Sequence, residues 1–175
     1  HSVESGRQKT SLAPLFFWPA ERALGLPASL SQLTAESRRM ADTRKVAFLV
    51  GSLRSASLNR AAALHAHGFF RDDTAVTTPD LAEIPAFNQD LEASGTPAVV
   101  TDLKNEVARS DMVVIFSPEY NYGIPGLLKN AIDWLSRPFQ AGSLIGRAVG
   151  IVCVSPSSRG GENVREQLLR TCQIL

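Results

Sequence analysis

The chain has 175 residues, of which 44% are hydrophobic and 20% charged, and its formal net charge is +1. These values are typical of one globular domain, and the near-neutral charge argues against the concentrated basic face that nucleic acids or acidic membrane surfaces require. No apolar run approaches the roughly 20 residues that cross a bilayer, so we expect a soluble protein without nucleic-acid or membrane partners.

Residues 1–44 show no sustained period of 2 or 3.6 and end in a charged run around Met40. They are predicted to form an N-terminal extension, largely disordered, with translation starting naturally at Met40. The alternative is a docking segment over residues 12–30 that uses Phe16, Phe17 and Trp18. Prolines and charges interrupt this apolar run, which argues against a signal peptide.

From residue 45 onward, apolar strand-like runs alternate with helical patterns, which predicts a parallel α/β sheet with right-handed crossovers. The predicted strands are 46–50, 74–78, 112–116 and 147–154. The predicted helices are 58–67, 97–108, one that follows the loop ending at Gly126, and 162–174, with a long connection through Pro85 before the second. In the first helix, Ala61, Ala62 and Leu64 are expected to face inward, with His65 and His67 on the surface. In the third helix the expected buried stripe is Leu127, Leu128, Ala131, Ile132 and Leu135.

The loop after the first strand offers hydroxyls and an arginine at the start of a helix. Ser52, Arg54, Ser57 and Asn59 suit a terminal monophosphate, because a dianion gains from the helix dipole, free backbone N–H groups and a charge-assisted arginine contact. The loop lacks the spacing of a dinucleotide or P-loop motif. A simple helix start capped by Ser57 carries equal weight.

The loop after the third strand, 117–126, is polar and aromatic. Tyr120 and Tyr122 can present flat amphipathic surfaces, while Asn121 can hydrogen-bond a planar heterocycle, although aromatic residues there could equally make core or interface contacts. Glu119 has no partner histidine or second carboxylate, which favours a structural or interface role over acid–base catalysis.

The loop after the fourth strand, 155–162, again opens a helix and contains the pair Gly160-Gly161. Three such loops follow neighbouring strands, at the edge where open parallel sheets bind ligands. No Ser-His-Asp or Cys-His set and no metal-ligand spacing can be assembled, so a bound cofactor is expected to carry the chemistry. Cys153 and Cys172 are predicted to be free, buried thiols in a reducing compartment, which indicates a cytoplasmic protein.

At this point the sequence resembles the NADPH-dependent FMN reductase family of flavodoxin-like proteins, close to its quinone- and chromate-reductase members. The resemblance covers Lys45 to about Arg170 and rests on several motifs. These are Gly51-Ser52-Leu53-Arg54 with Ser57 and Asn59; Pro85 with Asn88, Asp90, Leu91 and Glu92; Pro118 to Tyr122; Leu128 to Trp134 followed by Ser136-Arg137-Pro138; and Ser155 to Gly161.

The resemblance implies a flavodoxin-like three-layer sandwich that binds FMN. It implies that Ser52, Arg54, Ser57 and Asn59 hold the phosphate and that Ser155 approaches the pyrimidine edge of the ring. The ring would be bordered by Pro118, Glu119, Tyr120, Asn121 and Tyr122. By the same resemblance, NADPH or NADH reduces the flavin, which passes electrons to quinones, azo compounds, metal oxyanions or free flavin, in a homodimer or homotetramer.

The chain departs from the family pattern at its end. A flavodoxin-like sheet needs a fifth strand, whereas this chain stops after the helix that follows the fourth strand, so that strand 148–154, apolar on both faces, is expected at the sheet edge. We therefore expect a C-terminally truncated sequence. Two alternatives to the reductase stay open: a flavin-binding electron carrier without turnover, and a non-functional fragment.

Overall fold

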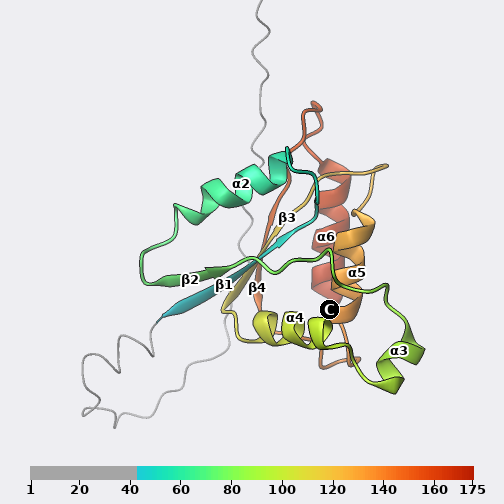
Figure 1. Cartoon of the computed structure of the whole chain (residues 1–175). Coiled ribbons are helices and arrows are strands. Elements are labelled where there is room, and N and C mark those ends of the chain that lie inside the picture. Colours follow the sequence, from blue (N-terminus) through green and yellow to red (C-terminus); the bar gives the residue numbers. More distant parts are fainter. Residues whose placement is uncertain (1–42) are drawn as a thin grey trace, which may run out of the picture.

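The computed structural model describes residues 43–175. The predicted N-terminal extension lies almost wholly outside these residues. Alternating strands and helices form a parallel sheet with helices on both faces, as predicted (Figure 1). The strands are β1 (Arg44–Val50), β2 (Thr74–Thr77), β3 (Met112–Phe116) and β4 (Ala148–Val152). The helices are α2 (Leu58–His67), α3 (Gln89–Ser94), α4 (Ala98–Ala108), α5 (Gly126–Leu135) and α6 (Glu162–Ile174).

The strand order is β2-β1-β3-β4, with every pair parallel. This is the flavodoxin-like order, in which the chain reverses its direction of winding between β1 and β3. The register pairs Val50 with Phe116, and Phe116 with Val152. Within the described residues β4 is an edge strand, as predicted. The three strands that precede the candidate loops therefore end side by side.

Two apolar clusters bury the two faces of the sheet. On one face, alternate residues of β1 and β3, such as Leu49 and Ile115, pack against α4, α5 and α6. On the other face, Phe48 and Phe116 pack against each other with ring centroids 4.9 Å apart, beneath α2. The continuous apolar runs of the central strands follow from burial on both sides.

The inward face of α2 differs from the prediction. Ala61 and Leu64 are exposed, Leu64 by 73%, and Ala62 is only partly buried. The buried residues of this helix are Asn59 and Ala63. The apolar pattern did not predict this face correctly because a polar residue, Asn59, lies on the buried side of the helix. Its side chain is hydrogen-bonded there to the backbone of Val154.

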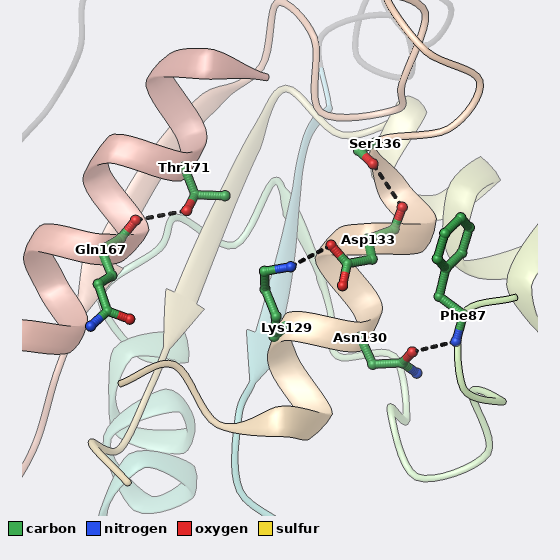
Figure 2. Close-up of polar contacts among 7 residues, drawn as sticks. All are labelled: Phe87, Lys129, Asn130, Asp133, Ser136, Gln167 and Thr171. Carbon is green, nitrogen blue, oxygen red and sulfur yellow. Dashed lines mark hydrogen bonds and ion pairs between the residues drawn. The ribbon is translucent and has the colours of Figure 1, made fainter. Parts of the chain in front are cut away.

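Helix α5 fixes the long connection before α4. Asn130 on α5 accepts a hydrogen bond from Phe87 N (2.7 Å, Figure 2) and donates from Nδ2 to Pro85 O (2.9 Å) and Ile84 O (3.3 Å). Trp134 Nε1 also donates to Pro85 O, at 2.8 Å. The short helix α3 follows, begun by the side chain of Asn88, which accepts from Asp90 N. The buried stripe of α5 is confirmed, with Leu127 partly buried.

Candidate functional site

Three loops begin at the carboxyl ends of β1, β3 and β4, and the sheet itself aligns them. Gly51 N donates to Phe116 O (2.8 Å), and Ser117 N donates to Val152 O (2.9 Å). The hydrogen-bond ladder of the sheet thus continues for one residue beyond β1 and β3 before the loops diverge. We call the loops 51–57, 117–125 and 153–161 the first, second and third loop.

The first loop buries two hydroxyl-bearing residues and exposes its arginine. Ser52 and Ser57 are 4% and 6% exposed, whereas Arg54 lies on the surface. Ser57 Oγ accepts from Arg60 N at 3.2 Å, which makes Ser57 the N-cap of α2, as the simpler prediction held. The capping role leaves the Ser57 hydroxyl hydrogen free to donate, so capping and anion binding are compatible.

Asn59 lies beneath the loops instead of at their surface. It is 2% exposed; its Nδ2 donates to Val154 O at 2.9 Å, and its Oδ1 accepts from Val154 N at 3.0 Å. These bonds join the start of α2 to the start of the third loop. A direct contact of Asn59 with a phosphate stays a prediction, and the structure adds a role in joining two of the loops.

The second loop makes a tight turn at Tyr120–Gly123. Tyr120 N donates to Gly123 O (3.2 Å) and Gly123 N donates to Tyr120 O (3.0 Å). The two central residues, Asn121 and Tyr122, have φ of 50° and 63°. Positive φ at both central positions is the mark of a type I′ turn. The turn holds the two tyrosines at the surface, 47% and 65% exposed, and leaves Pro118 partly buried.

Glu119 faces the third loop and α6. Its carboxylate accepts from Val164 N (3.1 Å) and Asn163 Nδ2 (3.3 Å). A carboxylate at the N-terminus of a helix satisfies an unpaired N–H group and interacts favourably with the helix dipole. Because Gly161, the residue preceding α6, offers no side chain, Glu119 supplies the cap from another loop. These contacts support the predicted structural role of Glu119.

The third loop turns sharply on its glycine pair. Gly160 and Gly161 have φ of 59° and 77°, and a Cβ on Gly161 would lie 2.9 Å from Cys153 Cβ. Near the start of the loop, Ser155 Oγ accepts from Ser157 N at 3.1 Å. Its exposed Arg159 stands 5.8 Å from the ring centroid of Tyr122, so the second and third loops meet at this pair.

The first and second loops also meet. Ser52 Oγ and Tyr120 Oη lie 3.5 Å apart. A hollow of about 400 Å³ lies on the other side of the first loop: besides Ser52 and Leu53 it is lined by residues of β1, α2 and the segment 78–81, and its lining includes no residue of the second or third loop. The predicted residues of all three loops therefore gather at one end of the sheet, around exposed tyrosines and arginines. No group of three or more His, Cys, Asp or Glu residues that could hold a metal occurs in the described part of the chain.

Gln167 was not predicted from the sequence as a residue of this region. Its side chain bonds the second loop on both sides of Gly123. No local pattern predicts this contact, because its partners Ile124 and Tyr122 lie 43 and 45 residues away in the chain.

The fold and the placement of these loops define an α/β flavodoxin-like protein with its candidate site at the carboxyl edge of the sheet. The family model "NADPH-dependent FMN reductase" matches residues 44–175, so the chain belongs to this family.

Known relatives agree with this assignment. The chain is 38% identical over 122 residues to a quinone reductase of Pseudomonas putida, covering 70% of this chain and 66% of the relative. It is 35% identical over 136 residues to an NAD(P)H-dependent FMN reductase of Pseudomonas aeruginosa, covering 78% and 73%. The chain thus spans about two thirds of the length of the first of these relatives.

Among solved structures, FerB from Paracoccus denitrificans, a flavoenzyme NAD(P)H:(acceptor) oxidoreductase, is similar with a TM-score of 0.70 and 32% identity. The similarity covers 75% of this chain and 71% of FerB. It supports the flavodoxin-like assignment reached from the strand order.

Proposed function

We propose that this protein is an FMN-dependent NAD(P)H oxidoreductase that passes electrons from bound flavin to quinones or to other small acceptors such as azo compounds, metal oxyanions or free flavin. The observation that carries the proposal is the meeting of the three loops at one edge of the sheet, in a chain that matches the FMN reductase family over residues 44–175. FMN supplies hydride and electron transfer when bound.

The first loop fits a phosphate by the chemistry of its donors. Ser52 and Ser57 provide hydroxyls, Arg54 provides a guanidinium, and the N-terminus of α2 provides a positive dipole. Arg54, Ser55 and Ala56 are exposed. The first loop would therefore hold the phosphate, as the family resemblance implies.

The second and third loops fit a planar ring. Tyr120, Asn121 and Tyr122 would border it together with Pro118 and Glu119, while Ser155 and the glycine pair would bring backbone groups to its edge. In this proposal the chain binds, orients and stabilises, and supplies no nucleophile.

We also propose that the protein is cytoplasmic and forms a homodimer or homotetramer. The exposed Tyr120 and Tyr122 support an association surface near the site, since exposed aromatic side chains are common at interfaces. In residues 43–175, no helix has both the length and the apolar character needed to cross a membrane.

The test is a visible absorbance scan after incubation with FMN and removal of free flavin, followed by an NADPH oxidation assay with a quinone. Retained flavin peaks and quinone-dependent oxidation are the expected result. Flavin retention without NAD(P)H oxidation would instead support an electron carrier. A folded chain that keeps no flavin would overturn the proposal.

A further inference from the structure

We infer that Gln167, on the second turn of α6, is a positioning residue: its side chain holds the Tyr120–Gly123 turn in the shape that the flavin site requires. The ligand in this inference rests on the proposed function. The contacts of the turn are independent of it.

The turn has a conformation that its own residues do not favour. Asn121 tolerates positive φ, but Tyr122, at φ 63°, is a bulky residue in a region that such side chains rarely adopt. The sequence preferred at this second central position is glycine. Contacts from outside the turn must therefore help to hold it.

Gln167 makes those contacts with both ends of its amide. Nε2 donates to Tyr122 O at 2.9 Å, and Oε1 accepts from Ile124 N at 3.4 Å. The two bonds lie on either side of Gly123, where an added Cβ would be 3.4 Å from Gln167 Oε1. One amide thus fixes the backbone on the exit side of the turn.

The entry side of the turn is attached to the same helix. Glu119 bonds Val164 N and Asn163 Nδ2 in the first turn of α6. The backbone at Gln167 is regular helix, and its carbonyl also accepts from Thr171 Oγ1 at 2.7 Å (Figure 2). Helix α6 therefore holds the turn at two points: through Glu119 on the entry side and through Gln167 on the exit side. Of these two side chains, Gln167 is the uncharged one.

The hydrophobic core does not fix the turn, which gives Gln167 its importance. Both tyrosine side chains are exposed, and Gln167 is itself exposed. Losing the amide would therefore loosen the turn without creating a cavity. If only a fraction of the molecules has the shape that binds the ligand, the apparent Kd equals the intrinsic Kd divided by that fraction.

The experiment compares the wild-type chain with Gln167→Met, which keeps the length of the side chain and removes both hydrogen bonds. Amide hydrogen exchange at Gly123 and Ile124 is measured without FMN, and the Kd for FMN is measured by quenching of flavin fluorescence. We expect exchange at Gly123 to become about three- to tenfold faster and the Kd to rise by about the same factor, as the loss of one or two exposed hydrogen bonds implies.

The matched control is Gln173→Met, the same change at an exposed position on the same helix. Its exchange and Kd should stay at wild-type values, and the apo unfolding midpoints of both variants should lie within about 3 °C of wild type. Unchanged exchange at Gly123, or an unchanged Kd, in Gln167→Met would overturn the inference. If the wild-type chain binds no FMN, the proposed function and the flavin part of the inference fall together, while the exchange result still decides whether Gln167 holds the turn.

Discussion

Asn59 and Val154, 95 residues apart in the chain, are joined by two buried hydrogen bonds of 2.9 and 3.0 Å that use both backbone groups of Val154. The side-chain amide of Asn59 thus satisfies Val154 in the way that a neighbouring strand would, with one donor and one acceptor. It connects the start of α2, directly after the first loop, to the third loop, which contains the glycine pair. The spacing between these two loops therefore depends on one amide.

Replacing Asn59 by alanine is expected to lower the free energy of unfolding by about 2–4 kcal/mol, because it leaves two buried backbone groups without partners. Asn59→Asp keeps the acceptor but sets a carboxylate oxygen against Val154 O, so it should be at least as harmful. Urea denaturation measures both. Asn105→Ala, at an exposed position of α4, should change stability by less than about 0.5 kcal/mol. Equal stabilities for Asn59→Ala and Asn105→Ala would contradict this assignment.

The glycines at the starts of α6 and α5 should respond in opposite directions to the same substitution. Gly161→Ala places a Cβ 2.9 Å from Cys153 Cβ at a φ of 77°, and should destabilise by about 2–4 kcal/mol. Gly126→Ala meets no atom within 4 Å, and should be neutral or stabilising by up to about 1 kcal/mol. Thermal unfolding of the two variants gives the sign. A stable Gly161→Ala protein would mean that the backbone at residue 161 can move away from Cys153.

Asn130→Ala should destabilise by about 2–3 kcal/mol, because it removes the contacts that hold residues 84–87 against α5. The control is Lys129→Ala on the same helix. Its ion pair with Asp133 is a surface i,i+4 contact (Figure 2), worth at most about 0.5 kcal/mol. Limited proteolysis of the 79–97 connection should show faster cleavage in Asn130→Ala only. Similar cleavage of both variants would show that Trp134 alone suffices to hold the connection.

Burial raises the pKa of the Cys153 and Cys172 thiols to about 11 in each case. For Cys153 the positive charge of Arg165 lowers the pKa and the carboxylate of Glu119 raises it, both less strongly than burial. The unfolded thiols lose their protons near pH 9.0 and the folded ones near pH 11, so stability should fall as the pH rises between these values. Urea denaturation at pH 8 and pH 10 should show a smaller loss in a Cys153→Ala, Cys172→Ala variant than in wild type. An equal loss in both proteins would assign the pH dependence to other groups.

The sheet, the order of its elements and most helix boundaries were predictable from the sequence, because buried parallel strands and amphipathic helices leave strong periodic signals. Helix α2 was predicted at 58–67, and the structure gives the same residues. The inward face of α2 was not predictable from apolar periodicity, since its key residue is Asn59. Helix α3 was missed because it is short, and none of its residues is buried.

The site was predictable to the level of its loops. Periodicity predicts loops at the carboxyl ends of the strands, and the strand order that the family resemblance implies places the residues after β1, β3 and β4 side by side. Which side chains face a ligand and which bind the protein itself depends on contacts across the chain, as with Glu119 at the start of α6 and Gln167 at the turn. Such contacts have no local signature, because their partners lie more than 40 residues away in the sequence.

The central pairing of the sheet, β1 with β3, passes over β2 and joins distant parts of the chain. Closing so long a loop costs entropy before any contact compensates, so parallel sheets of this kind are slow to fold. The candidate site needs β1, β3 and β4 all in register, and we expect it to appear late in folding. A ligand that binds there would hold the finished sheet together and slow its unfolding, but it could not guide the early steps of its assembly.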